Sequence, residues 1–247
     1  MTHITTGRKG QILVIKFNRP EKMNALTRDM YGDLAHALDE AAGDFGVKAV
    51  VLSSEGDHFT AGNDIQDFIS HPPTSDDSTV AAFLKSILEF PKPLIAAVKG
   101  NAVGVGTTML LHCDVVYASS TARFSLPFTS LGLVPEAGST LLLQKLIGYQ
   151  RAAKLFFTGE SFSADYAREV GLIAEVVNDP DHEALSLAET IAEQPPQAII
   201  NTKALMKATT HDSVGAVMRA EFEIFAMALQ SEEAADAFMK FMAKKGK

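Results

Sequence analysis

Two glycine-rich segments of the chain each follow an apolar run and offer backbone N–H groups to a ligand. Residues 60–64 read Thr-Ala-Gly-Asn-Asp, and residues 100–106 read Gly-Asn-Ala-Val-Gly-Val-Gly. A carboxylic acid, Glu136, follows within the apolar and small residues 131–139. Paired N–H donors stabilise a developing oxyanion, and a carboxylate can remove and return a proton. Together these features indicate an oxyanion hole served by one acid or base, which suits proton transfer beside a thioester carbonyl.

The second segment, in which Gly104 and Gly106 flank Val105, has three interpretations. A dinucleotide site is disfavoured, because Met109 stands where that fingerprint needs a third glycine and no acid ends a following strand about 20 residues later. A helix N-terminus whose free N–H groups and dipole stabilise negative charge fits the same residues. A simple tight turn also fits, so the residues alone leave the last two interpretations open.

The other two features also have a structural interpretation. Gly62 and Asn63 form a dipeptide that is common in turns, and Asp64 can cap a helix directly after it. Such a cap would direct the Asn63 N–H outward, so we expect Asp64 to orient the loop rather than transfer a proton. Glu136 follows a proline and suits the first turn of a helix over about 137–147, where an acid complements the helix dipole. Glu136 is therefore either a catalytic base or a first-turn acid.

Other catalytic devices are missing from the sequence. It has no Ser-His-Asp spacing, nucleophile elbow, P-loop or His-Glu-x-x-His helix. The histidines are scattered without the spacing of metal ligands, so we expect no metal site. The one cysteine, Cys113, lies in an apolar stretch and is expected to be a buried, inert thiol rather than a nucleophile.

Composition and charge limit the partners. The chain has 247 residues, of which 47% are hydrophobic and 21% are charged, so it can bury a sizeable core. Its formal net charge of -8 and the lack of an extended basic run argue against nucleic acid. No apolar stretch reaches the ~20 residues that span a bilayer, and no secretory signal opens the chain. We therefore expect a cytoplasmic protein that acts neither on nucleic acid nor in a membrane.

Short apolar runs alternate with helix-compatible segments, which favours an α/β fold of short, buried strands. The predicted strands are residues 11–17, 49–52, 94–98 and 115–118. Thr27 is expected to cap a helix whose apolar residues recur at helical spacing and which Gly43 ends. The polar, proline-bearing residues 71–78 should form a loop before a helix at 79–89. This loop is either an active-site lid or an ordinary surface loop.

The composition shifts to helix formers after residue 180. Helices are predicted at 181–193, 197–208, 213–229 and 231–243. Pro195 and Pro196 form the natural joint, so we divide the chain into a core at 1–195 and a helical region at 196–247. The last helices carry many apolar residues, which predicts that they cover a surface such as that of a second subunit.

The order and spacing of these segments resemble the crotonase, or enoyl-CoA hydratase/isomerase, superfamily over nearly the whole chain. The matching segments are residues 18–26, 58–65, 91–106, 113–118, 158–160 and 171–173, with Ala164 and Ala167. The resemblance implies a spiral of ββα turns, an acyl-CoA thioester as ligand, and a helical C-terminal region that assembles a homotrimer or a dimer of trimers. It implies no separate cofactor, since coenzyme A is part of the substrate.

The resemblance also assigns roles to individual residues. The family's two oxyanion N–H donors match Asn63 and Val105, and the CoA nucleotide is expected near Lys22. Further substrate-binding positions implied by the match are Asn24, Ala25, Leu26, Ala61, Gly62, Asp64, Ile65, Gly104, Gly106 and Phe128.

The chain departs from the hydratases of this superfamily. Their two catalytic glutamates match Thr108 and Phe128, neither of which is an acid or a base at neutral pH. Residues 124–136 resemble instead the peroxisomal-type delta(3),delta(2)-enoyl-CoA isomerases, whose catalytic glutamate follows a proline, as Glu136 does. This resemblance implies that Glu136 is the single proton shuttle, which takes the proton from C2 and returns it to C4.

Apolar neighbours in sequence, such as Phe128 and Leu133, should raise the pKa of Glu136 toward the working pH. Two alternatives to the isomerase stay open. The same scaffold can support another acyl-CoA reaction, such as hydration or hydrolysis, because pocket residues decide the chemistry. The chain can also be a non-catalytic acyl-CoA-binding or assembly protein in which Glu136 is only structural.

Overall fold

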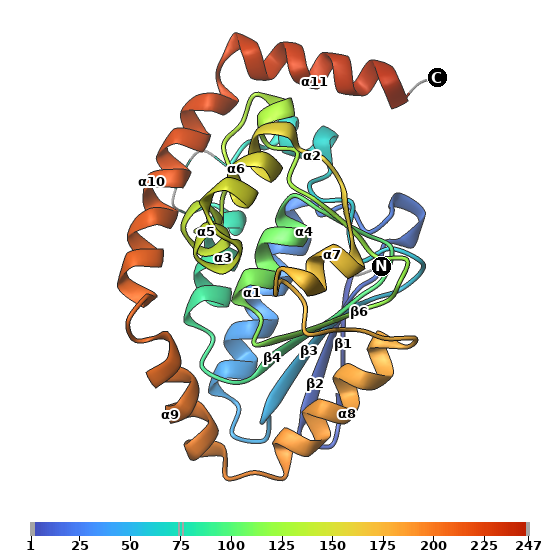
Figure 1. Ribbon diagram of the computed structural model, residues 1–247, viewed down its shortest axis with the longest axis vertical. Helices are drawn as coiled ribbons and strands as arrows, with labels where there is room; N and C mark the ends of the chain where they lie inside the picture. Colours follow the sequence, from blue (N-terminus) through green and yellow to red (C-terminus); the bar gives the residue numbers. More distant parts are fainter. Residues whose placement is uncertain (1–2, 74, 76, 246–247) are drawn as a thin grey trace.

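Two β-sheets surrounded by helices form the α/β architecture that the sequence predicts (Figure 1). The computed structural model describes residues 3–73, 75 and 77–245. Within this part, the larger sheet has the strand order β1-β2-β3-β4-β6-β9 and the smaller sheet the order β5-β7-β8. The strands are β1 (Ile4–Lys9), β2 (Ile12–Phe17), β3 (Ala49–Ser54), β4 (Leu94–Val98), β5 (Asn101–Val103), β6 (Val115–Ala118), β7 (Arg123–Ser125), β8 (Phe162–Ser163) and β9 (Glu175–Val176).

The helices of the described residues include long amphipathic ones and short turns. The α-helices are α1 (Arg28–Gly43), α2 (Ile65–Ser70), α3 (Thr79–Glu89), α4 (Val105–Thr108), α5 (Ser139–Ile147), α6 (Tyr149–Thr158), α7 (Ala164–Glu169), α8 (Pro180–Ala192), α9 (Pro196–Lys207), α10 (His211–Leu229) and α11 (Glu232–Lys245). Short 3-10 helices are η1 (Pro20–Lys22), η2 (Met109–His112) and η3 (Thr129–Leu131). Each strand predicted from an apolar run is present, and so are the four predicted C-terminal helices.

From β4 to β7 the chain alternates between the two sheets, which winds it into a spiral. β4 leads to β5 and β6 leads to β7, so each turn adds a strand to both sheets. Thr60, in the loop that follows β3, pairs with β5 of the smaller sheet. Its N–H donates to the Asn101 carbonyl at 2.9 Å, and its carbonyl accepts from the Val103 N–H at 3.1 Å. The spiral thereby places the two glycine-rich segments side by side.

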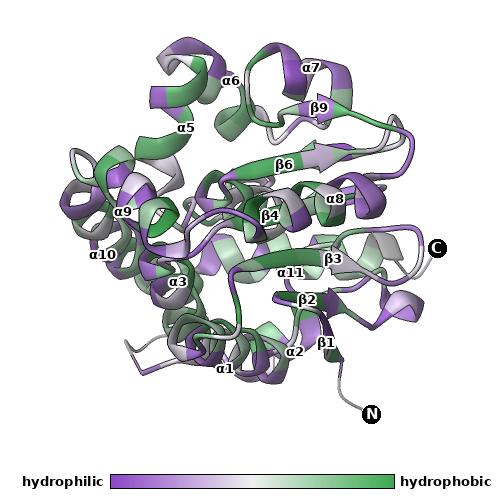
Figure 2. Cartoon of the chain, turned by 90° about the horizontal axis from the view of Figure 1, so that it is seen from below, coloured by the Kyte–Doolittle hydropathy of each residue, from purple (hydrophilic) through white to green (hydrophobic). Residues whose placement is uncertain are grey.

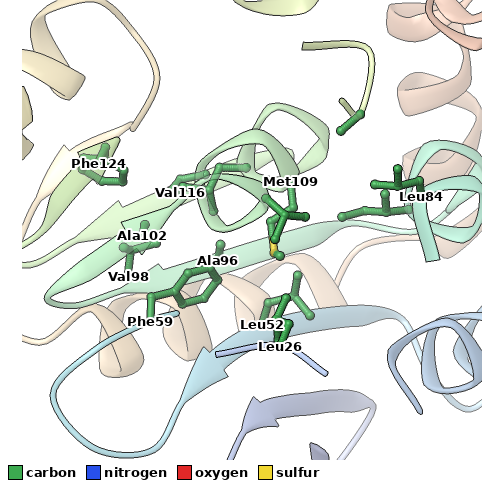
Figure 3. Close-up of a cluster of buried hydrophobic side chains, with 14 of the residues drawn as sticks. Leu26, Leu52, Phe59, Leu84, Ala96, Val98, Ala102, Met109, Val116 and Phe124 are labelled. Atoms are coloured by element: carbon green, nitrogen blue, oxygen red, sulfur yellow. The ribbon is translucent and has the colours of Figure 1, made fainter. Parts of the chain in front are cut away.

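The larger sheet is covered on both faces, which explains the near-continuous apolar runs of its central strands. All residues of β3 and β4 are buried. Helix α8 covers one face and packs small residues, Ala184 and Ala188, against it (Figure 2). The other face carries the main core, and the side chains labelled in Figure 3 are Leu26, Leu52, Phe59, Leu84, Ala96, Val98, Ala102, Met109, Val116 and Phe124. This core supports the loops that follow β3 and β5.

Helix boundaries agree with the sequence where the capping contact is local. The Thr27 side chain accepts a hydrogen bond from an amide in the first turn of α1, which ends at Gly43 as predicted. Asp64 caps α2, as expected, by accepting from two amides of its first turn. Helix α3 occupies the predicted residues, whereas Thr74 and Asp76 of the predicted loop before it lie outside the described residues.

Among the predicted helix starts that differ by a residue or two, the start of α5 changes the interpretation of Glu136. The helix predicted over 137–147 begins at Ser139, so Glu136 is not a first-turn residue. Ala137 and Gly138 both have positive φ values, 64° and 68°, and separate Glu136 from the helix. The interpretation of Glu136 as an acid that complements the dipole from within the first turn is therefore corrected.

The C-terminal helices wrap around the body of the spiral (Figure 1). Helix α10 packs on α5, and α11 folds back across η3. At this crossing a Cβ on Gly132 would lie 2.9 Å from the backbone of Ala234, so the close approach requires glycine. Val214, Phe225 and Phe238 of these helices are buried within the same chain. The helical tail therefore covers part of its own core in addition to any surface that it offers outward.

Candidate active site

The N–H groups of Asn63 and Val105 lie in the two adjoining glycine-rich segments. Asn63 directly precedes the capping residue of α2, and Val105 is the first residue of α4, which follows the capping residue Gly104. No acceptor for either N–H is found among the described residues. Both amides are therefore available to a ligand, as an oxyanion hole requires.

Close backbone packing holds the two segments together and explains two of the glycines. Gly62 has a positive φ of 82°, and a Cβ there would lie 2.8 Å from the Val103 carbonyl oxygen. A Cβ on Gly106 would overlap the Thr60 side chain. A larger residue at either position would push the segments apart and move the candidate donors.

A cavity of about 490 Å³ lies beside these amides, and we call it the outer cavity. The sequence-predicted residues in its wall are Lys22, Ala25, Ala61, Gly62, Asn63, Asp64, Ile65, Gly104, Val105 and Phe128. The C-terminal helices complete the wall with Phe225 of α10 and with Phe238 and Met242 of α11. Both candidate donors and most of the predicted substrate-binding residues are therefore brought together around one space, which the chain's own C-terminal helix helps to close.

Three of the predicted residues, Asn24, Leu26 and Gly106, lie behind the wall of the outer cavity rather than in it. Asn24 is fully buried, and its side-chain nitrogen donates to two loop carbonyls at 2.9 and 2.7 Å. The Leu26 N–H donates to the Gly62 carbonyl at 2.8 Å. These contacts hold the wall in shape.

Arg19 also lies in the wall of the outer cavity, although its residue type and position predict no role of its own. Its Nη1 donates to Asp64 Oδ2 at 2.7 Å and to the Ala25 carbonyl at 3.0 Å. Burial alone would raise the pKa of Asp64. Arg19 and two backbone amides together lower this pKa by more than burial raises it, so the pKa lies below its ordinary value. Asp64 thus stays ionised and orients the loop. The one feature of the sequence that could have indicated a role for Arg19 is its place in residues 18–26, the first segment that resembles the family.

Glu136 is buried, with 9% of its surface exposed. The Thr108 hydroxyl donates to Glu136 Oε1 at 2.5 Å, and Oε2 has no hydrogen-bond partner within the described residues. The pKa of Glu136 is raised to about 8, mainly by burial. The hydrogen bond from the Thr108 hydroxyl lowers this pKa, and the charge of Glu221 raises it. This direction agrees with the prediction from its apolar neighbours. A carboxyl group with such a pKa can take and give a proton near neutral pH.

Glu136 lines a second space of about 20 Å³, which we call the inner cavity. A space of this size holds about one water molecule. Asn63, Phe68 and Phe225 line both the inner and the outer cavity, whereas Val105 lines only the outer one. The unpaired oxygen of Glu136 is therefore separated from the outer cavity by the three residues that the cavities share.

Tyr31, on α1, connects the inner cavity to the first candidate donor. Its hydroxyl donates to Asn63 Oδ1 at 2.5 Å and lies in the wall of the inner cavity. Burial, and then the charge of Glu136, raise the pKa of Tyr31 well above its ordinary value, so the hydroxyl remains a donor. No local pattern in the sequence pointed to Tyr31, because the contact joins residues 32 positions apart.

The positions that match the hydratase glutamates supply no acid to the site. Thr108 is fully buried and serves as the donor to Glu136. Phe128 lines the outer cavity, where its ring lies 3.9 Å from the Cβ position of Gly104. Thr108 therefore contacts the carboxyl group and Phe128 shapes the outer cavity, and neither adds a second proton carrier.

Within the described residues, the cysteine and the possible metal ligands form no competing site. Cys113 is half-buried rather than buried, but desolvation still raises its pKa to about 12. The thiol therefore stays protonated and unreactive, as the sequence predicts. Among the described residues, no group of three or more His, Cys, Asp or Glu side chains is arranged to hold a metal ion. In the same part of the chain, none of the helices combines the length and the apolar character needed to cross a membrane.

Comparisons with known proteins agree on the family of the chain. Residues 7–247 match a family model described as enoyl-CoA hydratase/isomerase. The chain is 34% identical to enoyl-CoA delta isomerase 2 of Rattus norvegicus over 97% of its own length, and it spans 63% of that relative. It is 32% identical to the 2,3-dehydroadipyl-CoA hydratase of Escherichia coli (strain K12), with 99% of this chain and 97% of that relative covered. An isomerase and a hydratase are thus similar to the chain at nearly the same identity.

The fold is shared with solved structures as well. A crystal structure of an enoyl-CoA hydratase/isomerase from Pseudoalteromonas atlantica T6c superposes with a TM-score of 0.94 and 41% identity, covering 98% of this chain and 98% of that one. The prediction of a spiral α/β fold with a helical C-terminal region is confirmed.

Proposed function

Within the enoyl-CoA hydratase/isomerase family, to which this chain belongs, we propose that the protein moves the double bond of a 3-enoyl-CoA to the 2-position. One observation carries the proposal: of the described residues that line the inner cavity, Glu136 alone bears a carboxyl group. Thr108 and Phe128 occupy the positions that match the glutamates of hydratases. A single acid or base suffices for isomerisation, because the proton that is removed is also the proton that is returned.

The N–H groups of Asn63 and Val105 hold the thioester oxygen of the substrate. Their pull on the oxygen makes the hydrogen on C2 more acidic and stabilises the dienolate that forms when it leaves. A donor of this kind contributes roughly 2.7–4 kcal/mol to stabilisation of the transition state. Tyr31 supports this step by fixing the Asn63 side chain through the 2.5 Å hydrogen bond to its Oδ1.

Glu136 carries out both proton transfers. Its Oε2, which has no partner among the described residues, removes the proton from C2, and the electron pair of the broken C–H bond spreads over the dienolate. The protonated carboxyl group then delivers this proton to C4. The product has its double bond between C2 and C3, and Glu136 is again a carboxylate. Throughout, Oε1 stays with the Thr108 hydroxyl, which keeps the other oxygen directed at the substrate.

Turnover of a 3-enoyl-CoA by the wild type and by Glu136→Gln tests this function. We expect the substitution to reduce kcat roughly 10²–10⁴-fold, the usual contribution of a general acid or base. Acyl-CoA binding, measured by calorimetry, should be retained because Gln preserves the shape of the buried side chain. A matched control is Glu223→Gln on the exposed face of α10, which should leave kcat unchanged.

Product analysis separates the isomerase from its alternatives. The isomerase gives a 2-enoyl-CoA of unchanged mass, hydration adds one water to the substrate, and hydrolysis releases the free CoA thiol. The relative that is a hydratase makes hydration the second candidate. If the wild type binds acyl-CoA and converts none of it, the protein is a binding module and the enzymatic proposal fails.

We also propose that the C-terminal helices assemble the chain into a homotrimer or a dimer of trimers. Large apolar side chains of α9, α10 and α11 remain exposed in the single chain, and they are Leu205, Met206, Ile224, Met227, Met239 and Met242. Burying such side chains at an interface is favourable. Light scattering should give the mass of three or six chains, and Met206→Glu should lower it.

A further inference from the structure

Helix α5 begins without a capping side chain of its own, because its capping residue is Gly138. Glu221 of α10, which lies 83 residues along the chain, takes this place. Its Oε2 accepts from the Gly138 N–H at 2.6 Å, and its Oε1 accepts from the Thr140 N–H at 2.9 Å and from the Thr140 hydroxyl at 2.6 Å. Glu221 is buried, with 6% of its surface exposed, and this burial raises its pKa. The three donors oppose that rise, because they replace the water that a carboxylate needs.

The turn that Glu221 binds is the segment that aims Glu136. Ala137 has a φ of 64°, a left-handed conformation that residues other than glycine avoid. Contacts hold this turn on both sides, because His112 Nε2 donates to the Ala137 carbonyl at 2.7 Å while Glu221 binds the N–H of Gly138. The direction of the Glu136 side chain therefore depends on groups from η2 and α10 rather than on its own segment.

Helix α10 presents Glu221 close to residues that line the inner cavity with Glu136, among them Met218 and Phe225. We propose that Glu221 is a positioning residue for Glu136: its carboxylate holds the turn through Gly138 and places a second buried negative charge near the catalytic carboxyl. This inference rests on the proposed function, which gives Glu136 its catalytic role. The C-terminal helical region thereby serves the proton transfer itself, beyond closing the outer cavity.

The charge of Glu221 acts on a carboxyl group that has few other titrating neighbours. Tyr31 of α1 keeps its proton, because burial and then the charge of Glu136 raise its pKa well above the ordinary value. His112 of η2 is neutral, because burial lowers its pKa to about 4. A neighbouring anion disfavours ionisation of Glu136, and the Glu221 charge indeed raises the pKa of Glu136. Removing that charge should therefore lower the pKa of Glu136.

Titration of Glu136 in two variants of Glu221 tests the inference. Glu221→Gln keeps an acceptor oxygen but removes the charge, whereas Glu221→Asp keeps the charge but withdraws it from the turn. Carbon-13 NMR of protein labelled at the glutamate carboxyl reports the titration, and the Glu136 signal is the one that Glu136→Gln lacks. We expect its midpoint to fall by about one pH unit in Glu221→Gln. Glu223→Gln, an exposed change on the same helix, should leave the midpoint unmoved.

Kinetics supply the second measurement. Both variants of Glu221 should lower kcat for a 3-enoyl-CoA about tenfold with little change in KM, because a loosened turn misplaces Glu136. Only Glu221→Gln should also move the acidic limb of the kcat profile to lower pH. A purely structural role for Glu221 would reduce stability without moving this limb.

The outcomes are distinct from those that decide the proposed function. A Glu221→Gln protein that folds, as circular dichroism can verify, and that keeps both the wild-type midpoint and the wild-type kcat overturns the inference. If Glu221→Gln does not fold, Glu221→Asp decides, and a wild-type kcat in that variant is the contrary result. If the wild type binds acyl-CoA but isomerises none, the proposed function fails, while the NMR midpoint still decides whether Glu221 controls Glu136.

Discussion

The rings of Phe68 and Phe225 meet edge to face with their centroids 5.9 Å apart, and both rings line the outer and the inner cavity. Phe68 belongs to α2 and Phe225 to α10, so the pair joins the loop of Asn63 to the C-terminal helices. Because both cavities share these rings, we expect an acyl group that reaches Glu136 from the outer cavity to pass or displace the pair. The aromatic pair is therefore placed to control which acyl chains react.

Trimming this pair should change acyl-chain preference. Phe68→Leu removes part of the barrier while keeping an apolar side chain, so bulkier or longer 3-enoyl-CoA substrates should show a several-fold lower KM. Steady-state kinetics over a series of acyl-chain lengths measure the effect. Phe157→Leu, at a ring that is 71% exposed, serves as the matched control. An unchanged ranking of substrates in Phe68→Leu would show that the acyl chain takes another path.

Turnover should depend on pH through the ionisation of Glu136. The base must be a carboxylate to remove the C2 proton, and burial raises its pKa to about 8. As pH falls below about 8, a growing fraction of Glu136 carries a proton, so kcat should fall about tenfold per pH unit. A kcat profile from weakly acidic to weakly alkaline pH measures this limb. A flat profile down to the ordinary pKa of a glutamate would contradict a raised pKa in the substrate complex.

Removing the Thr108 hydroxyl should move the acidic limb of the kcat profile to higher pH, whereas removing the Glu221 charge should move it to lower pH. The hydroxyl donates to Oε1 at 2.5 Å and lowers the pKa of Glu136 against the effect of burial. Thr108→Val keeps the shape but loses the donor, so the pKa should rise further and kcat at neutral pH should fall. The same change at Thr107, whose hydroxyl donates to the Ala102 carbonyl at 2.6 Å, is a neighbouring control. The limb should stay in place in Thr107→Val.

The sequence predicted those parts of the structure that depend on near neighbours. Apolar runs located β2, β3, β4 and β6 because buried parallel strands need apolar residues on both faces. Thr27 and Asp64 marked helix starts because a capping side chain binds amides two or three residues away. The glycine-rich segments pointed to free backbone N–H groups, and the N–H groups of Asn63 and Val105 have no acceptor among the described residues.

The parts that the residues alone did not reveal depend on distant contacts. The segment before α5 resembled a first helical turn, but Glu221 caps this helix from a helix that follows much later in the chain. Likewise, the partner of Glu136 is Thr108, 28 residues earlier, and no local pattern encodes their meeting. The resemblance to a family supplied the catalytic assignment of Glu136 where the pattern of residues left it open. Neither the pattern of residues nor the family resemblance pointed to Tyr31 or Phe68.

The buried carboxyl group should also make the fold less stable as pH rises. A glutamate in the unfolded chain has a pKa near 4.5, whereas burial raises the folded-state pKa of Glu136 to about 8. Between these values the folded protein binds a proton that the unfolded chain has lost, so the free energy of unfolding falls with rising pH. Above about 8 both states are ionised, and the full penalty is present.

Denaturant unfolding of the wild type and Glu136→Gln at acidic and alkaline pH measures this penalty. Near the pKa of an ordinary glutamate the two proteins should differ little, because both side chains are neutral in the fold. Above about pH 8 the Gln variant should be more stable by a few kcal/mol, since it buries no charge. Glu221 is present in both proteins, so the difference reports Glu136 together with its interaction with the Glu221 charge. If the difference in unfolding free energy between the two proteins does not grow with pH, Glu136 is ionised in the free enzyme at every pH tested. The single-base mechanism would then need a carboxylate of ordinary basicity.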